Sequence, residues 1–408
     1  MSQIRSYIVV TAAYWAFTLT DGALRMLVLL HFHELGYSPF ELASLFFLYE
    51  LFGVLTNLIG GWLASRTGLK ATLFIGLSLQ IAALLMLSAL SPAWIQTAQV
   101  AYVVIAQGLS GIAKDFTKLS SKSAIKVLVP DGAHGTLFRW VALLTGSKNT
   151  LKGVGFFLGG LLLSQLGFRN ALWSMVGGLA ITLVLSALML PAGMGRAKVK
   201  VKLSRILAKS RAINVLSAAR LFLFGARDVW FVVALPVFLY DVVGWTFVEV
   251  GSYMAAWVIG YGAVQAFTPR LLDRAGAAHT NDARSAQLWG FLLAAVPLGI
   301  YAALRAGAPA SATVVVGLGI FGVLFAINSA VHSYLILAYS KSDEVALNIG
   351  FYYMANAAGR LVGTIASGLV YQYAGLGGCL LTAGGMVLVA SGLALLLPNP
   401  RAATRGCP

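Results

Sequence analysis

Long apolar runs separated by short polar or Pro/Gly-containing connections recur along the whole chain. A helix that crosses a bilayer needs about 20 apolar residues, and runs of this length recur about once per 34 residues, which allows about twelve crossings. The expected helices cover residues 7–33, 39–64, 71–90, 93–113, 136–166, 170–191, 212–240, 246–271, 285–304, 311–337, 345–373 and 376–397. The pattern predicts an all-α integral membrane protein with twelve transmembrane helices.

The composition agrees with this prediction and excludes a soluble enzyme. Of the 408 residues, 59% are hydrophobic and only 10% are charged, and the mean hydropathy is +0.84, whereas soluble domains are about 25% charged. Cys379 and Cys407 are the only cysteines, so neither a disulfide framework nor a cysteine-rich metal site is possible. We expect no enzymatic activity, no catalytic residue, no cofactor and no metal.

The chain carries a net charge of +16, from 29 Lys and Arg against 13 Asp and Glu. Such an excess is typical of nucleic-acid binding, of cytoplasmic loops, or of cations placed in the membrane to meet an anion. Most loop cations lie in alternate connections, while the opposite set holds only Arg169 and Arg305. The positive-inside rule then places both termini in the cytoplasm. No nucleic-acid partner is expected, and the first helix, which no signal-peptide cleavage site follows, is expected to be retained.

The sequence also repeats itself at an offset of 208 residues. Gly36, Ser38 and Glu41 correspond to Gly244, Thr246 and Glu249; Arg66 and Gly68 to Arg274 and Gly276; and Lys152, Gly155, Gly160 and Gly167 to Arg360, Gly363, Gly368 and Gly375. Two such six-helix halves in parallel orientation resemble the fold of the major facilitator superfamily, whose members bind substrate between the halves near the midplane.

The longest polar connection divides the chain between these halves. We predict an N-terminal six-helix half over residues 1–191, a basic cytoplasmic linker over 192–211, and a C-terminal six-helix half with a short cytoplasmic tail over 212–408. The basic linker is either an orientation signal or a binding patch for anionic lipid.

Two loop motifs resemble the superfamily signature GxxxDRxGRK. The first follows the second helix, with Gly61, Ser65, Arg66 and Gly68, and the second follows the eighth helix, with Asp273, Arg274 and Gly276. Ser65 replaces the Asp of the signature, which removes the acid of a conformation-locking salt bridge from the first copy. A third motif, residues 152–160, resembles the GPxxGG signature of antiporters but has Phe156 for Pro, and a Gly-rich face is also ordinary helix packing.

Charged residues inside the predicted helices are candidates for substrate contact, because each costs several kcal/mol there unless it faces a partner or a polar cavity. They are Asp21 and Arg25 on the first helix, Glu50 on the second, Lys148 and Lys152 on the fifth, Arg227 and Asp228 on the seventh, and Arg360 on the eleventh. Arg220 is a further cation, nearer the cytoplasm. We predict that Arg25, Lys148, Lys152, Arg227 and Arg360 bind an anion; the alternative is that they form structural ion pairs with the three acids.

Further polar residues allow two interpretations each. Lys114 and Lys118 begin a row of lysines spaced four residues apart, which predicts an electrostatic funnel for an anion or a solvated orientation signal. Asp21, Glu50 and Asp228 are candidates for proton coupling or for ion pairing. His332, one turn after Asn328, is either a proton relay or a hydrogen-bonded cavity residue.

Segments 14–39, 109–130 and 138–160 in particular, and nearly the full length in general, resemble the ArsJ-type organoarsenical efflux permeases of the major facilitator superfamily. The resemblance implies a secondary active transporter in the bacterial cytoplasmic (inner) membrane that exports 1-arseno-3-phosphoglycerate. It also implies functional partnership with a glyceraldehyde-3-phosphate dehydrogenase, which makes this ester from arsenate, and hence arsenate resistance.

Other functions remain open at this stage. An organophosphate:phosphate antiporter has the same fold and also carries arginines on the first and seventh helices. A proton-driven drug exporter predicts a more apolar or acidic cavity, and a non-transporting receptor does not need midplane cations. We expect a monomer whose partners are a small anionic substrate and membrane lipid.

Overall fold

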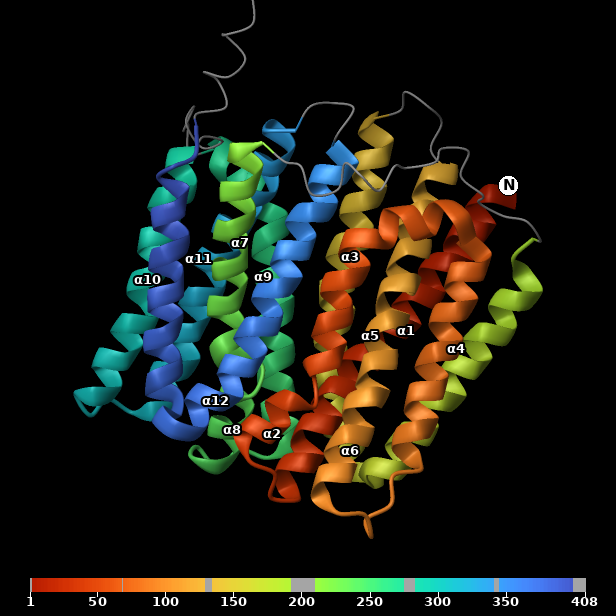
Figure 1. Cartoon of the computed structure of the whole chain (residues 1–408), viewed down its shortest axis with the longest axis horizontal. Coiled ribbons are helices and arrows are strands. Elements are labelled where there is room, and N and C mark those ends of the chain that lie inside the picture. Colours follow the sequence, from red (N-terminus) through yellow and green to blue (C-terminus); the bar gives the residue numbers. More distant parts are fainter. Residues whose placement is uncertain are drawn as a thin grey trace, which may run out of the picture. The chain divides into compact units, whose positions relative to one another are not determined.

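The computed structural model describes residues 2–67, 69–128, 134–191, 210–274, 283–340 and 345–398, which are helical with short turns and contain no strand (Figure 1). The helices are α1 (Ser2–Glu34), α2 (Pro39–Ser44), α3 (Phe47–Thr67), α4 (Leu69–Ser88), α5 (Gln96–Leu128), α6 (His134–Met189), α7 (Arg211–Phe231), α8 (Ala234–Asp241), α9 (Phe247–Arg274), α10 (Ala283–Arg305), α11 (Ala310–Ala338) and α12 (Val345–Ala394). The all-α membrane fold is confirmed.

Eight segments of the described chain are long and apolar enough to cross a bilayer. Two of them, Ser147–Met189 and Asn348–Ala394, have the length of two crossings each, at about 1.5 Å of rise per residue. They turn back at Gly167 and Gly375, whose φ angles of 72° and 60° are cheap only for glycine. The two double-length segments account for four crossings, and the other six segments account for one each. The remaining two predicted crossings correspond to α1 and α5, which carry charged residues and fall outside the eight. Each of the twelve predicted crossings therefore coincides with a helical segment.

Two predicted crossings are interrupted. The second divides into α2 and α3, and the seventh divides into α7 and α8. Pro236 in the first turn of α8 has no N–H to donate to the carbonyl of Val232, which accounts for the break before α8. The break between α2 and α3, at Leu45 and Phe46, has no Gly or Pro beside it. The fourth helix continues well beyond its apolar stretch, as the lysine row predicts, because α5 runs to Leu128.

The internal repeat is visible in the backbone. Gly36 and Gly244 both have positive φ, of 85° and 79°. Each precedes a capping box in which a backbone N–H donates to a carboxylate three residues later, Ser38 to Glu41 over 2.9 Å and Thr246 to Glu249 over 2.8 Å. These two capping boxes are 208 residues apart. The helices that follow them, α2 and α9, therefore begin in the same way in the two halves.

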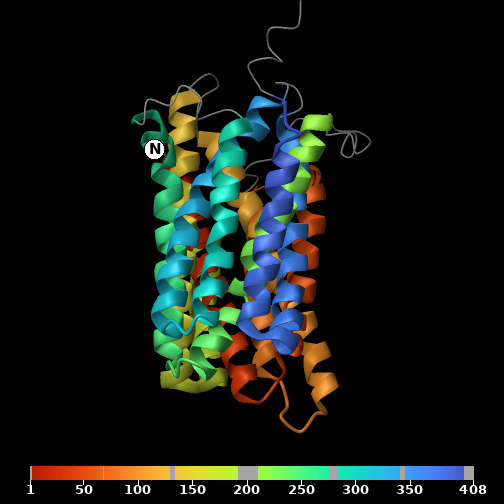
Figure 2. The same ribbon diagram turned by 90° about the vertical axis from the view of Figure 1, so that its left-hand side faces the viewer.

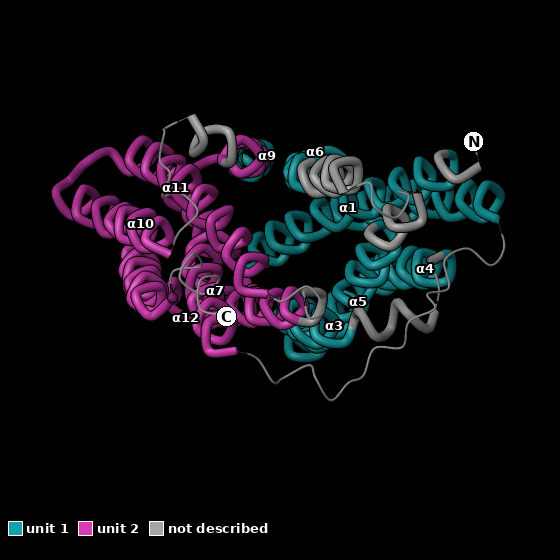
Figure 3. Tube along the Cα trace, turned by 90° about the horizontal axis from the view of Figure 1, so that it is seen from above, with its two compact units in different colours: residues 1–36, 44–203, 246–258 teal, residues 37–43, 204–245, 259–408 magenta. Residues whose placement is uncertain are grey.

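The chain forms two compact units, which Figure 3 shows in different colours. Unit 1 comprises Met1–Gly36, Ser44–Leu203 and Thr246–Val258, and unit 2 comprises Tyr37–Ala43, Ser204–Trp245 and Ile259–Pro408. In unit 1, α1 packs mainly against α6, and α5 against α3 and α4. In unit 2, α7 packs mainly against α12, while α10 contacts both α11 and α12 (Figure 2).

Each unit also contains a segment from the other half of the sequence. In unit 1, Gly160 of α6 lies directly against the backbone carbonyl of Phe247. In unit 2, Gly368 of α12 lies against the carbonyl of Pro39. Gly368 corresponds to Gly160, and Pro39 to Phe247, at the offset of 208 residues. The repeat therefore extends to packing, with glycine at the close approach in both units.

Other glycines bring together the helices that carry the predicted charges. A Cβ on Gly155 of α6 would lie 2.5 Å from the carbonyl oxygen of Leu19 on α1. A Cβ on Gly363 of α12 would lie 2.6 Å from the carbonyl oxygen of Gly225 on α7. Only glycine permits this spacing, so the α1–α6 and α7–α12 pairs depend on these two positions.

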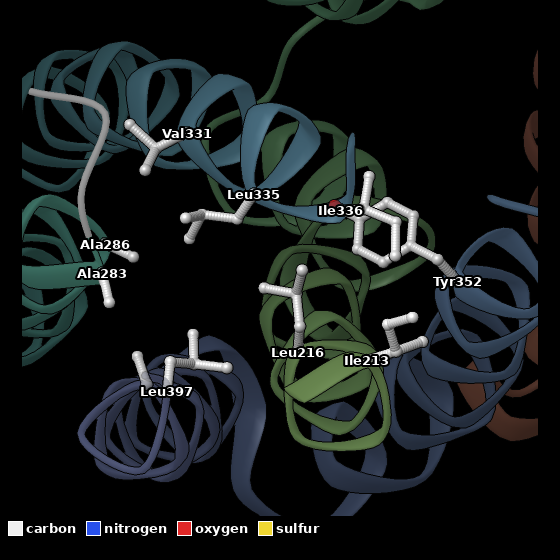
Figure 4. Close-up of a cluster of buried hydrophobic side chains, with 10 residues drawn as sticks. Ile213, Leu216, Ala283, Ala286, Val331, Leu335, Ile336, Tyr352 and Leu397 are labelled. Atoms are coloured by element: carbon white, nitrogen blue, oxygen red, sulfur yellow. The ribbon is translucent and has the colours of Figure 1, made fainter. Parts of the chain in front are cut away.

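A buried apolar cluster fixes the other side of α7 (Figure 4). Ile213 and Leu216 of α7 meet Leu335 and Ile336 of α11 and Tyr352 of α12, together with residues of α10. Since Leu216, Leu335 and Tyr352 are fully buried, the cluster holds α7 between α11 and α12 and so positions the arginines that follow it.

Candidate functional site

Unit 1 holds a buried ion pair between α1 and α3. Arg25 donates from Nη1 to Oε1 of Glu50 over 3.0 Å, and the Glu50 side chain is only 1% exposed. The guanidinium also lies over the rings of Phe46 and Tyr49, at 5.0 and 5.5 Å from Cζ to the centroids. Its Nη2 is buried and has no hydrogen-bond partner among the described residues. Arg25 thus retains donor capacity after pairing.

A second acid and cation of unit 1 meet through an aromatic ring. The Tyr49 hydroxyl donates to Oδ1 of buried Asp21 over 2.7 Å. Lys114 Nζ of α5 lies 3.9 Å from the centroid of the same ring. Tyr49 therefore connects a carboxylate of α1 with an ammonium of α5, so Lys114, the first lysine of the predicted row, belongs to this cluster.

Asp115, an acid that sequence reasoning missed, lies beside this cluster. It is buried, accepts a hydrogen bond from the Thr56 hydroxyl, and lies 3.7 Å from Lys118 Nζ. Lys118 also donates to Oδ1 of Asn57 over 2.9 Å. The available signal was the i, i+3 spacing of Asp115 and Lys118 on one helix.

Lys148 and Lys152 lie on α6 and are half-buried. Lys152 Nζ is 5.7 Å from the ring centroid of Phe156, and the carbonyl of Lys152 lies where α6 most closely approaches Gly22 of α1. The Trp15 indole of α1 donates to Ser147 over 3.0 Å. The two lysines therefore belong to the helix pair that carries Arg25.

Unit 2 holds a triad of two arginines and one aspartate. Arg227 donates from Nε to Oδ1 of Asp228 over 2.6 Å, and Arg360 donates from Nε to Oδ2 over 3.2 Å. The Asp228 side chain is 1% exposed. One buried carboxylate therefore serves two guanidiniums, one from α7 and one from α12, and the triad keeps a formal charge of +1.

Arg220, two turns before Arg227, has only neutral hydrogen-bond partners among the described residues. It donates from Nε to Asn356 over 3.0 Å and from Nη1 to the carbonyl and hydroxyl of Ser329 over 3.2 and 3.0 Å. Gln265 donates to the same Ser329 hydroxyl over 3.3 Å. Nearby on α11, His332 and Asn328 are buried, and His332 Nδ1 and Asn328 Oδ1 have no hydrogen-bond partner in the described chain.

Within each unit, the predicted charges lie on helices that pack against one another: α1, α3, α5 and α6 in unit 1, and α7 and α12 in unit 2. Among the charged residues described above, cations exceed acids by two in each unit, with Arg25, Lys114, Lys118, Lys148 and Lys152 against Asp21, Glu50 and Asp115 in unit 1, and Arg220, Arg227 and Arg360 against Asp228 in unit 2. Arg25, Arg227 and Arg360 each contact an acid, as the ion-pair interpretation requires. Among these described residues, positive charge therefore exceeds negative charge in both units.

The loop motifs lie mostly outside what the structure describes. Gly61, Ser65 and Arg66 lie in the last turns of α3, and Asp273 and Arg274 end α9, but their side chains are not described. Gly68 and Gly276 fall outside the described residues altogether. The role of these motifs stays a prediction. Among the described residues, no group of three His, Cys, Asp or Glu side chains lies close enough to hold a metal ion.

Comparison with known proteins decides the family. The family profile described as Major Facilitator Superfamily matches residues 7–280 and again residues 219–407. The chain belongs to the Major Facilitator Superfamily. It is accordingly a multi-pass membrane transporter, and the repeated match agrees with the repeat of its two halves.

Solved structures support the same fold. The chain resembles two crystal structures of POT family transporters, one in complex with a thioalcohol-conjugated peptide and one with 5-aminolevulinic acid, each with TM-score 0.74, 13% identity and 96% of both chains covered. It also resembles a bacterial homologue of the iron transporter ferroportin in an inward-facing state, with TM-score 0.70, 14% identity, and 97% of this chain and 98% of that chain covered. A comparison with curated protein sequences found no match. At these identities the likeness concerns the superfamily fold and not the substrate.

Proposed function

We propose that this superfamily member exports 1-arseno-3-phosphoglycerate from the cytoplasm by alternating access and so confers arsenate resistance. The membrane is the bacterial cytoplasmic membrane, and both termini lie in the cytoplasm. The proposal combines the resemblance of segments 14–39, 109–130 and 138–160 to organoarsenical permeases with one structural observation. That observation is the excess of two cations over acids among the charged residues named above in each unit.

The charge excess supports an anionic substrate on energetic grounds. A charge held away from water costs several kcal/mol unless a partner compensates it. An excess of cations in both units is therefore stabilised by a ligand that brings several negative charges. Arginine binds phosphate and arsenate oxygens in a bidentate manner, while lysine adds a movable point charge. An ester with one phosphate and one arsenate group carries the complementary charge.

The contacts suggest a role for each predicted residue. Lys114 and Lys118 attract the anion from the cytoplasm, and Arg25, Lys148, Lys152, Arg227 and Arg360 bind it. Glu50 and Asp228 hold their arginines in place before binding, over the 3.0 and 3.2 Å contacts of Arg25 and Arg360. When a substrate oxygen takes the place of a carboxylate, the released acid can accept a proton. This exchange gives a physical route to proton antiport through Asp21, Glu50 or Asp228.

The substrate requires an enzyme that makes it. A glyceraldehyde-3-phosphate dehydrogenase that accepts arsenate in place of phosphate forms the ester inside the cell, and the ester decomposes to arsenate once outside. Export then removes arsenate without direct recognition of the free ion.

A resistance assay tests this proposal. We expect cells that lack other arsenic exporters to grow in arsenate when they express both this chain and the dehydrogenase, and to fail when either is absent. An Arg305→Gln variant, altered at an exposed arginine at the end of α10, is the matched control and should remain resistant. Resistance without any dehydrogenase would contradict the proposed substrate.

An organophosphate:phosphate antiporter is the second candidate, and the arginines on α1 and α7 favour it. It predicts that a phosphate ester exchanges against inorganic phosphate across vesicles that contain the chain. A drug exporter receives no support from clusters with excess positive charge. Exchange of phosphate esters together with unchanged sensitivity to arsenate would favour the antiporter.

A further inference from the structure

Arg220 is a buried cation that the predicted substrate site leaves out. The residue is 4% exposed and lies in the middle of α7. Its hydrogen-bond partners are the side chain of Asn356 and the carbonyl and hydroxyl of Ser329, all of them neutral. No carboxylate of the described chain forms an ion pair with it, and its hydrogen bonds use Nε and Nη1. Arg220 therefore keeps its charge uncompensated and part of its planar donor set available.

Neutral contacts do not balance the cost of this burial. The guanidinium lies over Phe224 and Tyr352, at 4.0 and 5.0 Å from Cζ to the ring centroids. Cation–π contacts contribute about 0.5–2 kcal/mol each, whereas the desolvation of a buried ion costs several kcal/mol. Two buried polar atoms have no hydrogen-bond partner among the described residues: Ser217 Oγ, three residues before Arg220 on α7, and His332 Nδ1, three residues after Ser329 on α11. The surroundings of Arg220 are thus those of an oxyanion site and not of a closed ion pair.

Phe224 links Arg220 to the charged triad. The Cζ atoms of Arg220 and Arg227 lie 4.0 and 4.9 Å from the centroid of this one ring, so they are no more than 8.9 Å apart, which is the sum of the two distances. Asp228, the one acid of this cluster in the described chain, contacts Arg227 and Arg360 but has no contact with Arg220. Two guanidiniums at this separation repel each other unless negative charge is placed near both.

We propose that Arg220 and Arg227 bind two oxyanionic groups of a single short ligand across Phe224, with Arg220 as a specificity-determining residue for the second group. The inference rests on the proposed function, because the ligand is the transported anion. A chain of about three carbon atoms, with single bonds of about 1.5 Å, joins two oxyanions within this separation. Asn356 and Ser329 hold the Arg220 guanidinium in position and leave Nη2 for the ligand.

Direct binding measurements test this two-point site. The full-length protein in lipid nanodiscs is titrated with inorganic phosphate, glycerol 3-phosphate and 3-phosphoglycerate, which carry one, one and two oxyanionic groups. We expect 3-phosphoglycerate to bind at least tenfold more tightly than glycerol 3-phosphate. Arg220→Gln should remove this preference and leave the affinity for glycerol 3-phosphate within about twofold of native. Arg305→Gln should retain the preference.

The outcomes separate this inference from the proposed function. If the native protein binds one-oxyanion and two-oxyanion ligands equally well, the two-point site is wrong, even if anions bind and are transported. The same conclusion follows if Arg220→Gln weakens both ligands to the same degree. If Arg220→Gln fails to fold, the titrations of the native protein still test the two-point site. Arg220→Lys keeps the charge but loses the planar donor set, so it should also lower the preference for 3-phosphoglycerate. If no anion binds the native protein, the proposed function fails as well.

Discussion

Buried charged side chains in this transporter work in small sets. Arg25 pairs with Glu50, whereas Asp228 serves both Arg227 and Arg360. Removing one partner of a buried pair leaves the other uncompensated, at a cost of about 3–5 kcal/mol. The stability of each variant therefore reveals the pairing, while transport reveals whether the cation also meets the substrate.

A double-mutant cycle on Arg25 and Glu50 distinguishes an ion pair from a binding residue. We expect Arg25→Gln and Glu50→Gln each to lower thermal stability in detergent, because each leaves a buried charge. The double variant should recover most of that stability, since no charge remains unpaired, and should still fail to confer arsenate resistance. A stable double variant that retained resistance would reduce Arg25 to a structural role.

Asp228 is the key acid of unit 2. We expect Asp228→Asn to destabilise the protein more than Arg227→Gln or Arg360→Gln, because it leaves two guanidiniums without their carboxylate instead of removing one. The difference should amount to several kcal/mol and is measured by thermal or chemical denaturation of the purified variants. Equal or smaller destabilisation by Asp228→Asn would show that the two arginines do not depend on this acid.

The presence of these charges could be predicted from the sequence, but their partners could not. An Arg or Asp within an apolar run stands out because the bilayer makes it costly. Which acid meets which cation depends on the rotation and contact of helices, so the sharing of Asp228 could not be foreseen. Asp115 was missed because the surrounding lysine row is also typical of a solvated helix end, whereas its carboxylate is buried and accepts from Thr56.

At the scale of elements, glycine decides how closely the charge-bearing helices approach. Gly155 sets the contact of α6 with α1, and Gly363 sets the contact of α12 with α7. Gly167 and Gly375 instead turn the chain between two crossings. The repeat at 208 residues predicted that these positions correspond. Pro236 marks the interruption between α7 and α8 in the sequence, although the apolar run predicted one continuous helix there. The interruption between α2 and α3 has no Gly or Pro beside it and could not be predicted.

Substitution of the close-packed glycines should disrupt both stability and transport. We expect Gly155→Ala and Gly363→Ala to cost about 1–3 kcal/mol as overpacking, because the added Cβ would lie 2.5 and 2.6 Å from a backbone oxygen. Gly177→Ala is the matched control, since nothing lies within 4 Å of its Cβ position. Thermal stability and arsenate resistance are compared. A Gly155→Ala variant that behaves like Gly177→Ala would contradict the packing account.

At the scale of the whole molecule, cations exceed acids among the charged residues that the site description names in each unit, and the family match spans both units. The fold, the number of crossings and the repeat could be predicted from apolar periodicity and glycine spacing. The substrate could not, because excess positive charge specifies an anion and not its chemistry. The substrate proposal therefore depends on resemblance and has to be tested by transport.

Proton coupling is a property of the whole transport cycle. In everted vesicles, where the lumen corresponds to the outside of the cell, we expect an acidic lumen to speed uptake of the arsenylated ester several-fold. The reason is that an antiporter moves protons out of the lumen as the ester moves in. Uptake is followed by luminal arsenate, with and without an ionophore that collapses the gradient. Equal rates would remove the proton role of Asp21, Glu50 and Asp228.

The most direct test of the account is transport by the purified protein. Proteoliposomes that contain it are supplied with 1-arseno-3-phosphoglycerate, generated continuously by the dehydrogenase from arsenate and glyceraldehyde 3-phosphate, and luminal arsenic is measured over time. We predict accumulation well above that seen with free arsenate or with protein-free liposomes, and its loss in Arg360→Gln. Accumulation no faster than with free arsenate, by protein shown to be folded and inserted, would contradict the proposed export of the arsenylated ester.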